Sequence, residues 1–144
     1  MEMQIFTSNL YAMKTSKILY LAIALFLIQF NFAYAQSADS ATVVSVETFE
    51  KMAKKKKNAV LDVRTPEEMA EGHLIKALNF DFLDESFPEK IESLNKNKTY
   101  LLYCRSGKRT AKAGALMKAA GFKHVYMLDG GITAWTEEGK PIEK

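Results

Sequence analysis

Cys104 is the only cysteine of the 144-residue chain, and three cations and a glycine follow it within five residues. The segment reads Cys104-Arg105-Ser106-Gly107-Lys108-Arg109 and comes directly after the apolar run Thr99–Tyr103. The reactive form of cysteine is the thiolate, and nearby positive charge lowers the thiol pKa below its free value of about 8.5. A cysteine that is only a small buried hydrophobe would not usually be followed by so much positive charge. The segment therefore predicts that Cys104 is a nucleophile.

The residues on either side of Cys104 predict a loop that binds anions. Thr99–Tyr103 predicts a strand, and Thr110–Ala120 predicts a helix whose unpaired N-terminal amides, from about Arg109, point back toward the loop. Ligands of open parallel sheets bind beyond the carboxyl ends of the strands, where this loop would lie. Ser106 and Gly107 are small enough to let successive backbone amides converge on one anion.

The rest of the chain alternates short apolar runs with helical patterns. Thr65-Pro66-Glu67-Glu68 has the pattern of a capping box with proline at the first helical position, and Gly72 ends the short helix that follows. This alternation predicts an α/β fold with a mainly parallel sheet. The predicted strands are Thr42–Val44, Ala59–Val63, Leu78–Phe80, Thr99–Tyr103 and His124–Leu128, and the predicted helices are Ser45–Lys54, the one after Thr65, Pro88–Leu94, Thr110–Ala120 and one that carries Trp135.

Composition narrows the class of protein. The chain is 48% hydrophobic and 26% charged, which is ordinary for a globular protein. Its formal charge of +3 gives no reason to expect a nucleic-acid partner. A single cysteine excludes an internal disulfide.

Residues 1–35 are expected to be a signal peptide that directs the protein to the periplasm or out of the cell. A basic stretch, Met13–Lys17, precedes the apolar run Ile18–Ile28, and Ala33-Tyr34-Ala35 matches the small-x-small pattern of a cleavage site. We expect translation to start at Met13 and cleavage to follow Ala35. Residues 36–41 would then be a flexible leader, and residues 42–144 a single domain without stable membrane association. The alternative is an uncleaved membrane anchor.

A series of short motifs runs through the predicted domain: Asp62-Val63-Arg64, Glu67, Glu71-Gly72-His73, Ala77-Leu78-Asn79, Tyr103 to Thr110, Gly121-Phe122, Leu128-Asp129-Gly130-Gly131, Trp135 and Gly139-Lys140-Pro141. Each motif is weak alone, but their order and spacing together are specific. In these motifs the chain resembles the rhodanese-like sulfurtransferases over nearly all of the predicted domain. Lys76 departs from the family pattern, which usually has glycine at that position.

The resemblance implies a five-stranded sheet flanked by helices, and a thiosulfate sulfurtransferase that needs no metal or organic cofactor. Cys104 would attack the outer sulfur of a small anionic donor such as thiosulfate, expel sulfite and become a persulfide. A thiol or cyanide would then accept the sulfur. The amide groups of the loop would stabilise the thiolate and the persulfide. Arg109, with Arg105 or Lys108, would hold the anionic oxygens of the donor. We expect a monomer.

Two other classes of function remain as alternatives. Phosphatases and arsenate reductases of the same fold place five residues between cysteine and arginine, whereas four lie between Cys104 and Arg109, with Thr110 at the position that would complete the longer motif. The shorter loop favours a sulfur substrate. A non-enzymatic persulfide carrier or thiol-redox module is the other alternative, and the retained Arg105, Gly107 and Arg109 favour an enzyme over it.

Asp62 and Arg64 lie at the end of a predicted strand. We expect this end to lie at the same side of the sheet as Cys104. In the family, residues at these positions help to hold the active-site region, so we expect them to have a supporting role. The alternative is a surface ion pair of Arg64 with Glu67 or Glu71, which would contribute little stability.

The remaining residues that could do chemistry are expected to be structural. His73 and His124 could each form a pair with the cysteine, but the amide groups of the loop make a base unnecessary. Asp129 is expected to cap the last helix, and Trp135 to lie in the core. The basic run Lys54–Lys57 is expected to be a solvated helix end.

Overall fold

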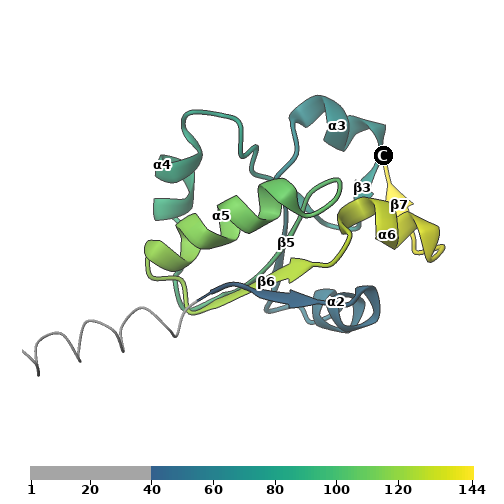
Figure 1. Ribbon diagram of the computed structural model, residues 1–144, viewed down its shortest axis with the longest axis horizontal. Helices are drawn as coiled ribbons and strands as arrows, with labels where there is room; N and C mark the ends of the chain where they lie inside the picture. Colours follow the sequence, from purple (N-terminus) through teal and green to yellow (C-terminus); the bar gives the residue numbers. More distant parts are fainter. Residues whose placement is uncertain (1–39) are drawn as a thin grey trace, which may run out of the picture. The chain divides into compact units, whose positions relative to one another are not determined.

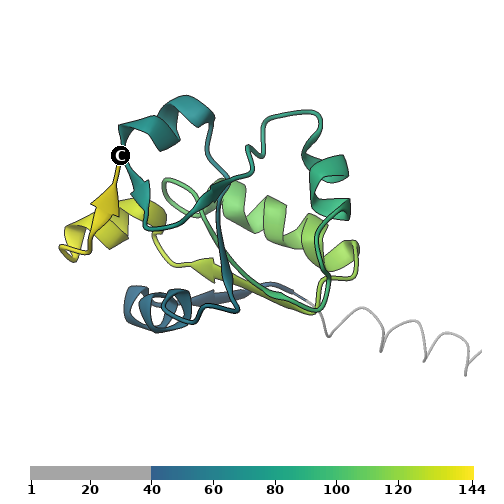
Figure 2. The same ribbon diagram turned by 180° about the vertical axis from the view of Figure 1, so that it is seen from behind.

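A five-stranded sheet forms the centre of the structure, a computed structural model that describes residues 40–144 (Figures 1 and 2). All neighbouring strands are parallel, which confirms the predicted fold class. The predicted signal peptide and most of the predicted leader lie outside the described residues. No described helix is long and apolar enough to cross a membrane. The strand order is β1 (Thr42–Val44), β6 (His124–Leu128), β5 (Thr99–Tyr103), β2 (Ala59–Asp62) and β4 (Leu78–Asn79).

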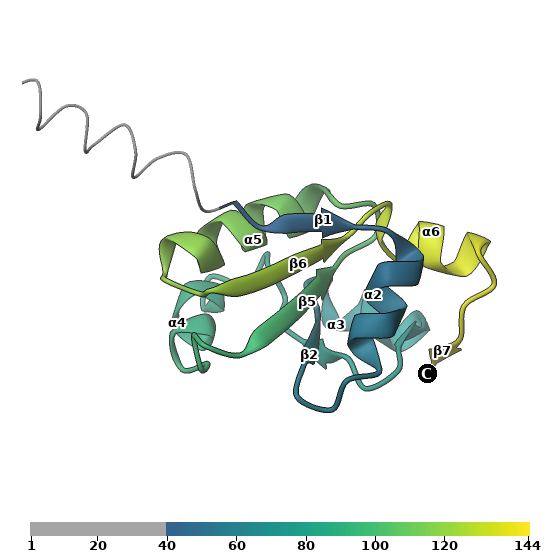
Figure 3. The ribbon, with the colours of Figure 1, turned by 90° about the horizontal axis from the view of Figure 1, so that it is seen from below.

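Helices cover both faces of this sheet, as Figures 1 and 3 show. Helices α4 (Phe87–Glu92) and α5 (Lys108–Ala119) bury apolar side chains against one face. Helices α2 (Val46–Ala53) and α6 (Gly131–Glu137) do so against the other face. The two apolar clusters are separate, so the sheet is a wall between two halves of the core.

Strand β5 alternates its side chains between these two halves. Tyr100 and Leu102 belong to the cluster under α4 and α5, and so does Cys104, the residue that follows the strand. Leu101 and Tyr103 belong to the cluster under α2 and α6. Because successive side chains of a strand point to opposite faces, the chain directs Tyr103 and Cys104 to opposite sides of the sheet.

The short helix α3 (Pro66–Glu71) begins as the sequence predicts. The hydroxyl of Thr65 accepts a hydrogen bond from the Glu68 N–H at 3.3 Å, and the Glu68 carboxylate accepts one from the Thr65 N–H at 3.3 Å. This reciprocal pair satisfies two of the amides that a helix leaves unpaired at its start.

Some boundaries differ from the prediction. Helix α5 begins at Lys108, one to two residues before its predicted start, and α4 begins at Phe87. A second, antiparallel sheet joins β3 (His73–Leu74) to β7 (Ile142–Glu143) and was not predicted. These two strands are short and pair segments that lie far apart in the sequence, so no local pattern marks them.

The predicted cap of the last helix is wrong. Gly130, not Asp129, is the N-cap residue of α6, and no side chain caps this helix. The backbone N–H of Asp129 instead donates to the Val44 carbonyl at 3.0 Å. Gly130 and Gly131 both have positive φ, 65° and 62°, so a tight left-handed turn starts the helix where a side-chain cap was expected. Trp135 lies in the core as predicted.

Candidate active site

The cysteine loop, residues 104–107, joins the carboxyl end of β5 to the start of α5. Its last residue, Gly107, has a φ of 102°, a left-handed conformation that favours glycine. There the Gly107 N–H donates a hydrogen bond to the Cys104 Sγ at 3.1 Å. Cys104 as a residue is only 1% exposed. The loop therefore curls its backbone around a buried sulfur atom.

Helix α6 holds the outer side of this loop. The Ile132 N–H donates to the Cys104 carbonyl at 2.9 Å, and the Thr133 N–H donates to the Arg105 carbonyl at 3.2 Å. The Thr133 hydroxyl donates to the same Arg105 carbonyl at 3.0 Å. Because these carbonyls point toward α6, the peptide amides of the loop are turned toward the sulfur.

Gly131 allows this close contact between α6 and the cysteine loop. A Cβ at this position would collide with the carbonyl oxygens of Cys104 and Arg105. The sequence indicates only a break at Gly130-Gly131, because the contact joins segments that lie far apart along the chain.

Hydrogen-bond donors around the sulfur lower the pKa of Cys104. Burial raises this pKa, but donation from the Thr110 hydroxyl and from the backbone of Thr110, Gly107 and Ser106 lowers it by more. The Thr110 hydroxyl is buried and has no hydrogen-bond partner among residues 40–144. No other acceptor therefore competes with the sulfur for its proton. The lowered pKa agrees with the thiolate that the sequence predicts, although sequence reasoning assigned no role to Thr110.

Arg109 is bound to a carboxylate that the sequence did not connect to the site. Its Nη1 lies 2.5 Å from Glu68 Oε2 and its Nη2 lies 2.8 Å from Glu68 Oε1. The hydrogen bonds from Arg109 lower the pKa of Glu68 to about 2, against the desolvation that raises it. Glu68 raises the pKa of Arg109, and the Cys104 sulfur does so to a smaller extent. Arg109 therefore lies between a carboxylate and the sulfur, with its charge largely balanced.

The other polar residues of the loop face solvent. The Arg105 side chain is 64% exposed, and its Nε lies 3.4 Å from Glu68 Oε1. Ser106 and Lys108 are exposed as well, and no ion pair of Lys108 occurs among residues 40–144. All the predicted loop residues thus lie on one short loop or at the start of α5, where Arg105 and Lys108 are the exposed cations.

Asp62 and Arg64 form a buried network on the opposite face of the sheet from Cys104. Arg64 Nη2 donates to Asp62 Oδ2 at 2.6 Å and to the Gly72 carbonyl at 2.8 Å. The Tyr103 hydroxyl donates to the same Asp62 oxygen at 2.5 Å and accepts from the Leu74 N–H at 3.1 Å. Tyr103 immediately precedes Cys104, so the network fixes the end of β5 from behind.

This network replaces the alternative ion pair of Arg64 with Glu67 or Glu71, which is wrong. Burial, followed by the hydrogen bond to Asp62, raises the pKa of Tyr103, which stays a protonated donor. Sequence reasoning missed Tyr103 because a tyrosine within an apolar strand looks like any other core residue.

Neither histidine pairs with the cysteine. His73 lies on β3, where its Nε2 is 3.5 Å from Glu143 Oε1. His124 is exposed at the start of β6, at the opposite end of the sheet from the cysteine loop. No group of three His, Cys, Asp or Glu side chains in residues 40–144 could hold a metal ion. The absence of a cofactor stays a prediction.

Comparisons with known proteins agree with this geometry. The family model of the Rhodanese-like domain matches residues 45–138. A protein named "Sulfurtransferase" from Allochromatium vinosum is 36% identical over 83 residues, which are 58% of this chain and 76% of the relative. "Thiosulfate sulfurtransferase 16, chloroplastic" from Arabidopsis thaliana is 34% identical over 93 residues, 58% of this chain and 78% of that protein.

A solved structure shares the fold. The rhodanese-related protein from Thermoplasma volcanium aligns with a TM-score of 0.63 and 29% identity, over 71% of this chain and 97% of that one. Together, the sulfurtransferase relatives support sulfur transfer as the general chemistry of the site.

Proposed function

Because the chain belongs to the rhodanese-like domain family, we propose that it transfers the sulfane sulfur of thiosulfate, or of a similar donor, through a persulfide on Cys104. The observation that carries the proposal is the 3.1 Å hydrogen bond from the Gly107 N–H to the Cys104 sulfur. Donors fixed around the sulfur favour the thiolate that must attack.

In the first step, the Cys104 thiolate attacks the outer sulfur of thiosulfate. A bond forms between Sγ and that sulfur, the sulfur–sulfur bond of thiosulfate breaks, and its electron pair leaves with sulfite. The product is a Cys104 persulfide anion, so no proton has to be transferred. A histidine base is therefore unnecessary, in agreement with the positions of His73 and His124 away from the cysteine.

In the second step, an acceptor such as cyanide or a thiolate attacks the terminal sulfur and releases the Cys104 thiolate. The persulfide bond is about 2 Å long, so the terminal sulfur would extend beyond the buried Sγ, where an acceptor can reach it. The inner sulfur stays on Cys104, a residue that is only 1% exposed. Burial of the inner sulfur directs the acceptor to the outer one.

The positive charges around the cysteine loop suit an anionic sulfur donor. Glu68 balances much of the charge of Arg109, so Arg109 holds the loop and contributes only part of its charge to a ligand. Arg105 and Lys108 would meet the sulfonate oxygens. The relative named for thiosulfate supports this choice of donor.

A thiosulfate:cyanide assay tests the proposal. The wild-type chain should form thiocyanate in repeated turnovers, and Cys104→Ser should lose this activity entirely, because serine cannot form a persulfide. Appreciable sulfur transfer by the variant would contradict the assignment of Cys104. Loading with sulfur but no turnover would favour a non-enzymatic carrier.

We further propose that the protein acts as a monomer after export. The support for export is the pattern of residues 1–35, a basic stretch followed by an apolar run and Ala33-Tyr34-Ala35. The mass of the protein recovered from the periplasm or medium would test it, since cleavage after Ala35 should leave Gln36 as the first residue.

A further inference from the structure

A groove of about 570 Å³ lies on the face of the sheet opposite Cys104. It is built at the ends where β2, β4 and β5 begin, with Ala59, Leu78 and Lys98 among its lining residues. Lys98 and Cys104 are separated by the whole of β5, roughly 20 Å of extended chain. The groove is thus separate from the sulfur site.

The walls of the groove are apolar and partly uncovered. Leu74 and Trp135 contribute buried side chains to it, whereas Ile75 and Leu78 are 47% and 54% exposed. Removing such apolar surface from water is favourable, so an apolar group lying in the groove would be stabilised. The volume is within the range of about 300–1,000 Å³ that is typical of small-molecule pockets.

The rim of the groove is strongly cationic. Lys55, Lys56, Lys76 and Lys98 line it, and none of their ammonium groups forms an ion pair within residues 40–144. The carboxylate of Glu50 also lines the groove, but Lys54 at 2.8 Å and Lys140 at 2.7 Å already bind it. The site therefore offers several unpaired cations and no unpaired carboxylate.

Lys76 adds a second and independent observation. It is the only non-glycine residue with positive φ, 60°, among the described residues. Its backbone N–H donates to the Glu143 carboxylate at 2.7 Å, which helps to hold the turn. Glycine would adopt this conformation without strain. The strained position carries an ammonium group to the groove, and such outliers are found more often at functional sites.

We propose that this groove binds a small amphipathic anion. The apolar body of the ligand would lie against Leu74, Ile75 and Trp135, and its carboxylate or other anionic group would be held by the lysines of the rim. An apolar pocket with a few charged groups at its border is typical of sites that bind such ligands. The proposal does not depend on sulfur transfer at Cys104.

The chain carries its own reporter for this site. Trp135 is the only tryptophan of the sequence, and it lines the groove. Titration of the full chain with octanoate should change the Trp135 fluorescence and reach saturation. Octylammonium, with the same tail and the opposite charge, and acetate, with the charge but no tail, should produce little change at the same concentrations.

Two variants of the groove sharpen the test. Lys76→Gly removes an ammonium group while relieving backbone strain, so it should fold at least as stably as the wild type. Lys98→Gln removes a second ammonium group. Each should weaken octanoate binding about two- to fivefold, the range of single exposed ion pairs.

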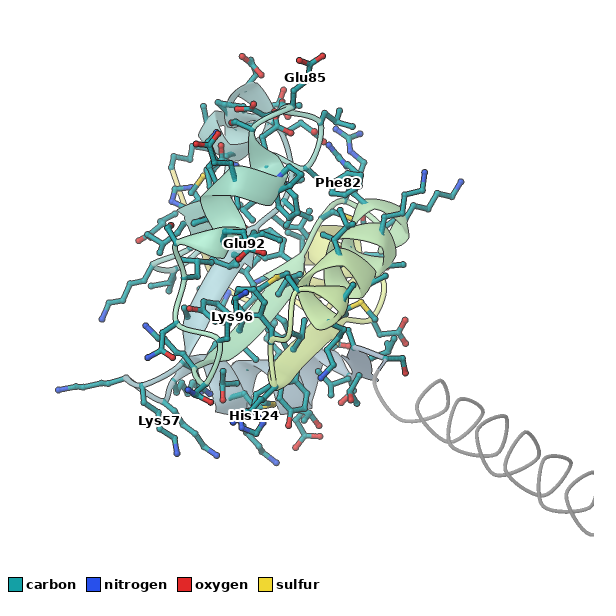
Figure 4. The ribbon with its side chains drawn as sticks, turned by 90° about the vertical axis from the view of Figure 1, so that its left-hand side faces the viewer. Lys57, Phe82, Glu85, Glu92, Lys96 and His124 are labelled. Carbon is teal, nitrogen blue, oxygen red and sulfur yellow. The ribbon has the colours of Figure 1, made fainter. Side chains whose placement is uncertain are left out.

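The matched control is Lys57→Gln, from the same basic run. Lys57 is exposed and is not among the residues that line the groove; Figure 4 shows its side chain at the same end of the molecule as that of His124. Octanoate should bind this variant as it binds the wild type. Cys104→Ser should also leave binding unchanged.

Four results would overturn the proposal. They are a fluorescence change that does not saturate, equal binding of octanoate and octylammonium, equal weakening by Lys57→Gln and Lys76→Gly, and binding of an acidic peptide without binding of octanoate. The last result would make the groove a protein-docking surface instead.

Discussion

Tyr103 and Cys104 are neighbours in the chain, yet they serve two regions that differ in kind. Cys104 lies on the sheet face covered by α4 and α5, next to backbone hydrogen-bond donors and to the exposed cations of its loop. Tyr103 lies on the α2/α6 face, in a network with Asp62 and Arg64 that is buried and paired throughout. The alternation of one strand thus separates chemistry from support. Changes at the cysteine loop should alter thiol reactivity, and changes in the network should alter stability.

Among changes that act on the cysteine loop, Gly131→Ala should have the largest effect on turnover. The added Cβ would collide with the carbonyls of Cys104 and Arg105, displacing the loop, so turnover should fall roughly tenfold to a hundredfold. The control is Gly139→Ala, because Gly139 has a similar φ of 68° but no atom within 4 Å of the added Cβ. The control should lose only about 1–2 kcal/mol of stability. Equal turnover in the two variants would contradict the role of α6.

Thr110→Val should have the next largest effect. The pKa of Cys104 should rise, because the buried hydroxyl that stabilises the thiolate is lost. Less thiolate is then present at neutral pH, so iodoacetamide should alkylate the protein more slowly and with a higher pH midpoint. Thr110→Ser should restore the midpoint. An unmoved midpoint in the valine variant would show that the hydroxyl does not act on the sulfur.

Glu68→Gln should affect stability more than turnover. It removes the Arg109 ion pair, whereas glutamine can still serve the capping box, so about 2 kcal/mol of unfolding free energy should be lost at neutral pH. The folded pKa of about 2 is below the ordinary 4.5, so this stabilisation is present above pH 4.5 and is lost as pH falls toward 2. The gap between wild type and variant should close over that range in acid denaturation.

The control for this change is Glu71→Gln, an exposed residue of the same helix, which should leave stability nearly unchanged. A gap that persists unchanged down to pH 2 would contradict the assignment of this stabilisation to the ionised Glu68 carboxylate.

Tyr103→Phe should have the smallest effect on reactivity. It removes the hydrogen bond to Asp62, which Arg64 still binds, and it also takes away the acceptor of the buried Leu74 N–H. About 2–3 kcal/mol of unfolding free energy should therefore be lost. Thiol alkylation and turnover should stay within about twofold of the wild type, since the ring lies behind the sheet. A large loss of reactivity with little loss of stability would break the separation of the two faces.

The sequence predicted those parts of the structure whose signal is local. Most strands of the main sheet are short, mainly apolar runs, and the capping box at Thr65 lies within four consecutive residues. The cysteine loop is a local motif as well, because strand, nucleophile, cations and helix follow one another without interruption. These elements could be placed before any contact between distant segments was known.

Most of the missed features join distant segments, Thr110 beside the cysteine loop being the exception. Glu68 and Arg109 are 41 positions apart, and so are Asp62 and Tyr103. The contact of Gly131 with the cysteine loop also depends on how α6 packs, and the same packing explains why the predicted Asp129 cap is wrong. The capping box already accounts for Glu68, so nothing in the neighbouring sequence indicated that it also binds Arg109.

The most direct test of the central claim is the intact mass of the protein before and after incubation with thiosulfate. A Cys104 persulfide should add the mass of one sulfur atom, which cyanide should remove with release of thiocyanate, and Cys104→Ser should gain nothing. An unchanged mass of the wild-type protein, or the same gain in Cys104→Ser, would contradict the proposal that sulfur is carried on Cys104.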